Sequence, residues 1–204
     1  MELLLMSAAF LLGLLSFFEP CTIATHTLFA ARAHHDSSRQ RSAALCLLVA
    51  SRVGLLALIF GLAAFAGLSA LSTSMVMAML GGIGLLYLVT RKIYLPVPHL
   101  EFFRLLPRHQ NLPQGLKLGL TLPACTLPLV GIVGMVSALT QQPSSGVLAG
   151  ALFGVMFSVP TLWGSVRGLN ADARAFLGTS ASLSPYLTAA LLWGAALVIG
   201  QTGN

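Results

Sequence analysis

The sequence predicts an all-α integral membrane protein with six transmembrane helices. Hydrophobic residues make up 56% of the 204 residues, charged residues only 8%, and the mean hydropathy is +0.88. Charged residues are about a quarter of an ordinary soluble domain, so this composition excludes that class. The basic residues lie between apolar runs, as in a membrane protein. In each half of the chain, a proline closely followed by a Cys-Thr pair interrupts an apolar run.

Six apolar segments are candidates for spanning helices, each of which needs about 20 residues. No basic region precedes the first segment, so we expect a retained span and not a cleaved signal peptide. The sixth segment contains Pro185 near its start, and its helix can begin before that residue. The expected spans are 3–31, 43–68, 74–90, 114–139, 145–166 and 183–201.

The basic residues predict the orientation of these helices. Ten of the eleven lie in the first, third and fifth connections, with the third taken as residues 91 to 117 so that it includes Lys117 at the edge of the fourth span. The exception, Arg52, lies inside the second span. Connections rich in Lys and Arg remain in the cytoplasm. We therefore expect a multi-pass protein of the cytoplasmic (inner) membrane with both termini outside. Basic residues placed in this way do not indicate nucleic-acid binding.

The two halves of the chain read as copies of one unit within a single membrane domain, 1–204. The first repeat is 1–90, a cytoplasmic linker is 91–113, and the second repeat is 114–204. Three spans in each copy give the copies opposite orientations, which is an inverted repeat with its site near the membrane midplane. Small residues such as Gly81, Gly82, Gly84, Gly150 and Gly154 favour close helix packing.

The linker mixes aromatic and basic side chains. Phe102 and Phe103 stand beside Arg104, and prolines interrupt the segment repeatedly. Such a segment can lie in the membrane interface, with its basic side chains on anionic lipid. Docking of a cytoplasmic partner is the alternative reading.

Chemistry is predicted at the two interrupted spans, 16–32 and 118–134. The repeated residues are Pro20, Cys21, Thr22, Pro123, Cys125 and Thr126. A break inside a membrane helix leaves backbone groups that need partners, and hydroxyl side chains such as those of Thr22 and Thr126 can supply them. Symmetry would bring Cys21 and Cys125 together, where they could alternate between dithiol and disulfide. Cys46 has no proline and no counterpart, and we read it as a packing residue.

Exchange between a dithiol and a disulfide needs no metal, flavin or nucleotide. The sequence has no Cys-x-x-Cys pair, no phosphate-binding glycine loop and no His-Glu-x-x-His motif. We therefore expect neither a cofactor nor a bound metal, and read the chain as a thiol–disulfide oxidoreductase.

The two interrupted stretches resemble the CcdA family of membrane thiol–disulfide transporters and the related membrane domain of the DsbD proteins. The resemblance covers nearly the whole chain and implies six spans as an inverted repeat with external termini. It implies that Cys21 and Cys125 are the redox pair and that Pro20, Pro123 and Pro128 mark the flexible breaks. It also implies electron transfer from cytoplasmic thioredoxin to thioredoxin-like acceptors outside, including those that serve cytochrome c maturation.

Three further polar residues lie within the spans. Glu19 and Arg52 fall at similar predicted depth, where a charge is costly, and pairing would reduce the cost for each. A role for Glu19 in tuning Cys21 or relaying protons is the alternative. His26 shares a helix face with Glu19 but points away from Cys21, so it is a poor base for that cysteine.

Two other classes of function remain open. A transporter of a metal ion or small anion would share the inverted repeat and use Cys21, Glu19 and His26 at a midplane site. A scaffolding subunit would tolerate replacement of its cysteines. Neither reading is excluded by the sequence.

Overall fold

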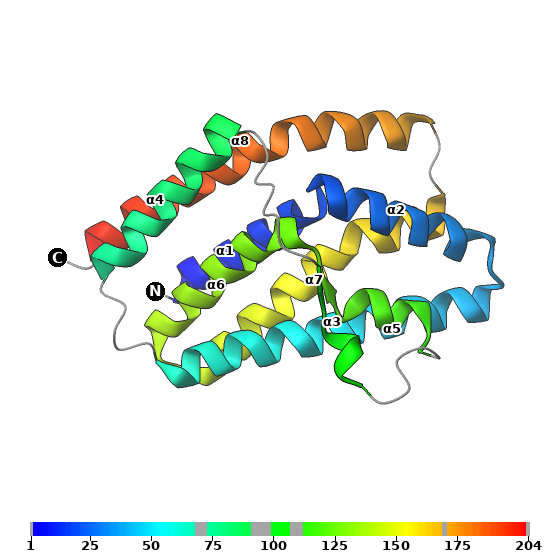
Figure 1. The fold of residues 1–204 in the computed structure, drawn as a ribbon, viewed down its shortest axis with the longest axis horizontal. Helices are drawn as coiled ribbons and strands as arrows, with labels where there is room; N and C mark the ends of the chain where they lie inside the picture. Colours follow the sequence, from blue (N-terminus) through cyan, green and yellow to red (C-terminus); the bar gives the residue numbers. More distant parts are fainter. Residues whose placement is uncertain (1, 68–72, 91–98, 107–111, 169–170, 203–204) are drawn as a thin grey trace.

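The structure is a computed structural model of the chain and describes residues 2–67, 73–90, 99–106, 112–168 and 171–202. Long helices account for most of the described part, and two short strands pair near its middle (Figure 1). The elements are α1 (Glu2–Phe17), α2 (Pro20–His35), α3 (Ser38–Ala66), α4 (Thr73–Thr90), β1 (Leu100–Glu101), the 3₁₀ turn η1 (Phe102–Leu105), α5 (Gln114–Gly119), β2 (Thr121–Leu122), the 3₁₀ turn η3 (Ala124–Thr126), α6 (Leu127–Thr140), α7 (Pro143–Arg167) and α8 (Ala171–Thr202).

The prediction of an all-α membrane protein is confirmed, but six full-length spans are not found. Among the described residues, three helices are long and apolar enough to cross a membrane: α3, α7 and most of α8. A fourth crossing is reached only if α1 and α2, bent by 74°, form one broken span. The 14 residues of α6 extend about 21 Å at 1.5 Å per residue, short of a hydrocarbon core of about 30 Å. The apolar part of α4, Ser74–Val89, is also short.

The bend between α1 and α2 and the shortness of α6 both result from interruptions next to prolines. Helix α1 ends at Phe17, and Glu19 adopts an extended conformation (φ −67°, ψ 139°) before α2 begins at Pro20. Proline suits this first helical position, where its missing N–H would have had no helical partner. In the second half, Pro123 is likewise extended (φ −58°, ψ 142°) between β2 and η3. Each interruption places a cysteine at the start of a new helical segment.

Helices α3 and α7 share the most extensive contact between helices in the described part of the chain. Gly146, Gly150 and Gly154 recur every four residues on α7 and face α3. A Cβ at Gly150 would collide with the backbone of Leu56, and one at Gly146 would lie 2.5 Å from the carbonyl oxygen of Phe60. This ridge of small residues therefore lets the two helix backbones approach closely.

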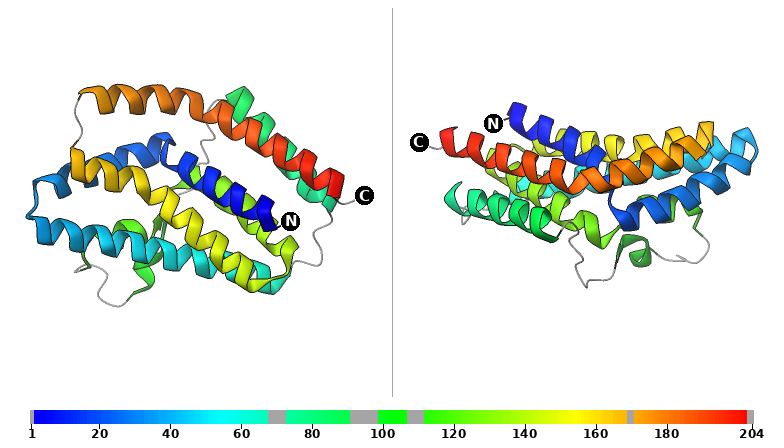
Figure 2. Two further views of the ribbon diagram at one scale, coloured as in Figure 1. Left: turned by 180° about the vertical axis from the view of Figure 1, so that it is seen from behind. Right: turned by 90° about the horizontal axis from the view of Figure 1, so that it is seen from above.

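The other helices are arranged around this pair in a symmetric way. Helices α1 and α2 pack on α7, α5 and α6 pack on α3, and α4 packs on α8. Figure 2 shows α4 and α8 side by side along one edge of the molecule. Exchanging α1–α4 with α5–α8 therefore preserves these main contacts, although α1 also packs on α6 and α8 without contacts of similar extent by α5.

The helix ends divide into two groups. His34, at the end of α2, bonds the carbonyl oxygen of Ser165 through Nδ1 (3.1 Å), so the α2–α3 turn lies near the end of α7. At the opposite end, the Cβ position of Gly67, after α3, lies 3.7 Å from Gln141, after α6. The turn before α3 and the turn before α7 are thus at opposite ends of the molecule (Figure 1).

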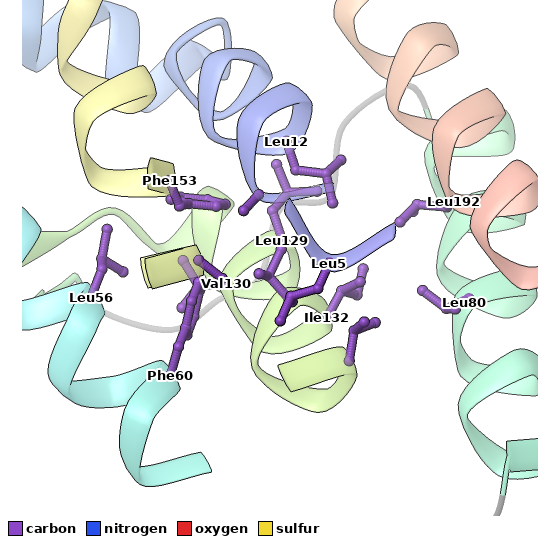
Figure 3. Close-up of a cluster of buried hydrophobic side chains, with 14 of the residues drawn as sticks. Leu5, Leu12, Leu56, Phe60, Leu80, Leu129, Val130, Ile132, Phe153 and Leu192 are labelled. Carbon is purple, nitrogen blue, oxygen red and sulfur yellow. The ribbon is translucent and has the colours of Figure 1, made fainter. Parts of the chain in front are cut away.

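Apolar side chains from all of the long helices fill the interior, and Phe29 and Ala33 of α2 form a second, smaller cluster with Leu45 and Leu48 of α3. Figure 3 shows Leu5 and Leu12 of α1 facing residues of α3, α6 and α7, with Leu80 and Leu192 completing the cluster from α4 and α8. Large apolar side chains also cover the outside, including Leu58, Leu62, Phe65, Val89 and Leu197. An apolar exterior is what a bilayer requires, in agreement with a membrane location.

Part of the third connection folds onto the second interruption. Leu100 and Glu101 of β1 pair antiparallel with Leu122 and Thr121 of β2. The Phe102 N–H donates to the carbonyl oxygen of Leu120 (3.0 Å), and the Phe102 side chain packs against the core. The linker predicted at 91–113 is therefore partly structured, with residues 91–98 and 107–111 outside the described part. Helix α5 begins at Gln114, where the second repeat was expected to start.

Candidate functional site

The two interrupted segments meet in the interior of the protein. The hydroxyl of Thr22, on the first turn of α2, lies 3.8 Å from the sulfur of Cys125 on η3. Both side chains are buried, with exposed fractions of 0% for Thr22 and 7% for Cys125. Cys21 precedes Thr22 on α2, but its side chain and that of Pro20 lie outside the described residues. The fold thus brings together the two stretches that sequence analysis singled out.

The backbone around Cys125 is held by three hydrogen bonds. The N–H and the hydroxyl of Thr126 both donate to the carbonyl oxygen of Pro123, at 3.0 and 2.8 Å. The N–H of Ala124 donates to Nδ1 of His99 (3.2 Å), which reaches η3 from the third connection. The expectation that Thr126 bonds the interrupted backbone is confirmed. The hydroxyl of Thr22 contacts the Cys125 sulfur, and for this residue the expectation stays a prediction.

Pro128 occupies the second position of α6, immediately after η3. A proline there fits the first turn of a helix and removes one N–H that would have had no helical partner. Pro123 and Pro128 thus flank the Cys125 turn on both sides.

His26 connects this region to the rest of the core. It is fully buried, and its Nδ1 lies 2.9 Å from the carbonyl oxygen of Thr22 and 3.2 Å from the hydroxyl of Thr25. Its Nε2 lies 2.7 Å from a guanidinium nitrogen of Arg52. Because an arginine only donates, Nε2 must accept, which leaves the proton on Nδ1 to be donated to Thr22. The contacts therefore select one neutral tautomer of His26.

Arg52 on α3 is fully buried and contacts segments from both halves of the chain. Besides His26, it donates to the carbonyl oxygen of Leu118 on α5 (3.1 Å) and to the hydroxyl of Ser158 on α7 (3.4 Å). Its guanidinium carbon lies 4.2 Å from the centre of the Phe157 ring, a cation–π contact. Its Nε has no hydrogen-bond partner. Arg52 is thus the centre of a polar cluster joining α2, α3, α5 and α7.

The expected pair between Glu19 and Arg52 is not observed. Within the described residues, the one ion pair of the structure joins Arg104 and Glu101. Glu19 is buried, with 4% of its surface exposed, and interacts with Tyr87 of α4. Its Oε1 and the Tyr87 hydroxyl nevertheless lack hydrogen-bond partners. Similar depth was insufficient for pairing because Arg52 turns toward α2 and α7.

The metal-transport alternative gains no support from the site. Both ring nitrogens of His26 are engaged, by the Thr22 carbonyl and by Arg52, and neither is free for a metal. No group of three or more His, Cys, Asp or Glu side chains suited to a metal occurs in the described part of the chain. His34 bonds Ser165 at the end of α7, well away from Cys125 along the chain. Cys46 is exposed on α3, apart from the site.

Sequence reasoning missed three contributors to this region. His99 lies in a segment read as a linker, Tyr87 in an apolar run, and Ser158 among many hydroxyl residues of membrane helices. The one signal available for His99 was its position as a titratable side chain within an apolar run of that linker. Comparison with protein families, characterised proteins and solved structures finds no match for the chain.

Proposed function

We propose that the protein transfers reducing equivalents across the membrane by thiol–disulfide exchange at Cys21 and Cys125. The observation that carries this proposal is the 3.8 Å approach of Thr22, the neighbour of Cys21, to the sulfur of Cys125. These positions are 103 residues apart in sequence, and both belong to interrupted segments in an apolar core. Packing alone does not require two cysteine-bearing interruptions to meet.

The symmetric arrangement of the helices supports an inverted repeat. The main contacts, those of α1 and α2 with α7 and of α5 and α6 with α3, correspond when α1–α4 are exchanged with α5–α8, and the equivalent turns before α3 and α7 lie at opposite ends. An inverted repeat places its reactive site between the copies and makes it approachable from either side in turn. This suits a carrier that receives electrons on one side and delivers them on the other.

The partners belong to the same proposal. A cytoplasmic thioredoxin would reduce the cysteine pair, and a thioredoxin-like protein outside would be reduced by it, as the resemblance to the CcdA family implies. Cytochrome c maturation or a related thiol reduction would be the process served. The proposal places the protein in the cytoplasmic membrane, with both termini outside.

The test is the redox state of the two cysteines in native membranes. Free thiols are alkylated before and after reduction, in cells with and without cytoplasmic thioredoxin, and each cysteine is quantified by mass spectrometry. We expect one reducible bond between Cys21 and Cys125 that accumulates when thioredoxin is absent. A Cys46→Ser variant should behave like the natural protein, whereas Cys21→Ser should leave Cys125 alkylated in both strains. Cysteines that stay reduced in both strains would contradict the proposal.

A further inference from the structure

We propose that Thr22, His26 and Arg52 form a polar chain that stabilises the thiolate of Cys125 during disulfide exchange. The inference rests on the proposed thiol–disulfide function and adds the side chains that hold the negative charge. None of the three would react with a partner. They are positioning residues that act on the Cys125 sulfur through hydrogen bonds and charge.

The first step concerns the charge of Arg52. This arginine is fully buried and makes no ion pair with any acidic residue of the described part of the chain. Its partners are His26, a backbone carbonyl, a hydroxyl and an aromatic ring. A buried cation without an anion is unfavourable, so the site gains stability when a negative charge forms nearby.

The second step is that little water is available to compensate this charge. A cavity of about 320 Å³ between α1, α2, α7 and α8 reaches His26, and its walls are mostly apolar, including Phe17, Val159 and Phe176. A surface with so few polar groups offers water few hydrogen-bond partners. In such surroundings, a charge acts over a longer distance than it does in water.

Contacts at His26 and Thr22 place Arg52 and a hydroxyl close to the Cys125 segment. Arg52 donates to Nε2 of His26 (2.7 Å), Nδ1 of His26 donates to the Thr22 carbonyl (2.9 Å), and the Thr22 hydroxyl lies 3.8 Å from the Cys125 sulfur. The hydrogen bonds from Arg52 end at the Thr22 carbonyl, and the hydroxyl that approaches the sulfur is a separate group of the same residue. Arg52 therefore acts on the Cys125 sulfur through its charge, which favours a negative charge nearby. The Thr22 hydroxyl can donate directly to a thiolate.

The chemistry creates a thiolate at this place. A donor thiolate attacks the sulfur of Cys21, a bond forms between donor and Cys21, and the Cys21–Cys125 bond breaks with its electron pair left on Cys125. A second donor thiolate then attacks the mixed disulfide, which releases Cys21 as a thiolate and leaves the donor as a disulfide. The two protons lost by the donor dithiol balance the two taken up by the cysteine pair. A stabilised leaving thiolate accelerates the first step.

Other charged or titratable groups near Cys125 are few. Two helices pack against η3; of these, α6 has no charged or titratable side chain, and α2 contributes Glu19 at its start, Cys21 and His26. The remaining charged and titratable side chains of α2 begin at Arg32, ten residues and about 15 Å beyond Thr22. From the third connection, His99 bonds the Ala124 N–H. Arg52 is therefore the permanent positive charge that reaches this segment through contacts.

The experiment measures how readily Cys125 forms a thiolate in the isolated, reduced, full-length protein. The rate of its reaction with N-ethylmaleimide is followed by mass spectrometry from about pH 5 to 10, which brackets the ordinary range of a thiol. Thr22→Val keeps the shape of the side chain and removes the hydroxyl, and Arg52→Gln removes the charge. We expect each to raise the pH of half-maximal reaction by about one unit, a tenfold loss of thiolate below that pH.

Three controls separate this effect from structural damage. Thr22→Ser and Arg52→Lys, which retain the hydroxyl and the charge, should stay within about half a unit of the natural protein. Thr188→Val removes a buried hydroxyl on α8 that has no partner, and should change nothing. If Arg52→Gln does not fold, the comparison of Thr22→Val with Thr22→Ser alone tests whether the hydroxyl stabilises the Cys125 thiolate.

The inference and the proposed function fail in different ways. An unchanged midpoint in Thr22→Val, in a protein whose cysteines respond to thioredoxin in cells, would overturn the polar chain alone. The opposite result is a raised pH of half-maximal Cys125 alkylation in Thr22→Val, with the redox state of the natural cysteines the same in cells with and without thioredoxin. It would support the polar chain and overturn the proposed transfer of electrons. The first measurement needs no partner protein, so the two results are independent.

Discussion

Glu19 is the residue whose placement is hardest to explain by packing. Its carboxyl is buried at the bend between α1 and α2, Oε1 lacks a hydrogen-bond partner, and Cys21 follows two residues later. A negative charge there would oppose the formation of a thiolate at Cys21. We predict that Glu19→Gln preserves folding and lowers the pH of half-maximal alkylation of Cys21 by about half to one unit.

Glu2→Gln is a suitable control for this prediction. Glu2 accepts a hydrogen bond from Ser145 near the N-terminus, and an amide oxygen can accept the same bond. The control should leave the Cys21 profile unchanged. An unchanged profile in Glu19→Gln would show that Glu19 does not influence the cysteine and would assign it a structural role with Tyr87.

At the scale of the elements, the contact between α3 and α7 depends on Gly150. A Cβ at this position would meet the backbone of Leu56 and Ala57, which cannot move without separating the helices. We predict that Gly150→Ala destabilises the protein by about 1–3 kcal/mol, the usual range for overpacking in a tight core. The measurement is the midpoint of thermal unfolding in detergent.

Gly54 provides the matched comparison on the opposing helix. It lies in the interior of α3, and a Cβ there would have no neighbour within 4 Å. Gly54→Ala should raise stability by about 0.5–1 kcal/mol, because alanine is the better helix former. Equal effects of the two substitutions would contradict the close packing of α3 on α7.

The short strand β1 holds the Cys125 turn from outside the helices. His99, the residue before β1, accepts a hydrogen bond from the Ala124 N–H, next to Cys125. Removing this acceptor with His99→Ala should loosen η3. We predict up to about tenfold faster amide hydrogen exchange in peptides covering 121–126, since one hydrogen bond contributes about 0.5–1.5 kcal/mol.

His35→Ala is the control for the His99 substitution, because His35 is exposed at the end of α2. It should leave exchange in this peptide unchanged. Equal exchange in His99→Ala and the natural protein would show that β1 and β2 hold the turn without the histidine.

For the whole molecule, composition and apolar runs predicted the class of fold and the positions of the helices well. They overestimated the number of helices that are long enough to cross a membrane, because hydropathy counts apolar residues and not helical rise. The residues from Leu120 to Thr126 are apolar but form a strand and a 3₁₀ turn, which leaves α6 with 14 residues. The same local signals did identify the interruptions at Pro20 and Pro123.

The partners of buried polar residues were less predictable. The sequence gives the approximate depth of Arg52 in the membrane, but the direction of its side chain depends on how α3 rotates against α2 and α7. That rotation follows from packing at Gly146, Gly150 and Gly154, far from Arg52 in sequence. His99 was also hidden, since a strand of two residues has no periodicity to detect.

The side of the membrane on which the third connection lies depends on whether α4 crosses the membrane after α3. Helix α5 packs on the first half of α3, with Gly115 against Ala44, so the chain enters the second repeat near the end of the molecule that carries Ser38. The basic residues of this connection favour the same side. We predict that Leu105, which is 82% exposed, lies on the cytoplasmic side with Ser38.

Labelling of single cysteines with a membrane-impermeant maleimide tests this prediction. The three natural cysteines are first replaced by serine, and one cysteine is then introduced at Ser38, Leu105, Gln142 or Gln201. Gln142 lies at the end of the molecule opposite Ser38, as the contact between Gly67 and Gln141 requires. We expect labelling of Gln142→Cys and Gln201→Cys in intact cells, and of Ser38→Cys and Leu105→Cys only after permeabilisation. If Leu105→Cys is labelled in intact cells together with Gln142→Cys, α4 and the α5–α6 segment do not cross the membrane. The inverted repeat would then fail, because each copy would no longer contain three crossings.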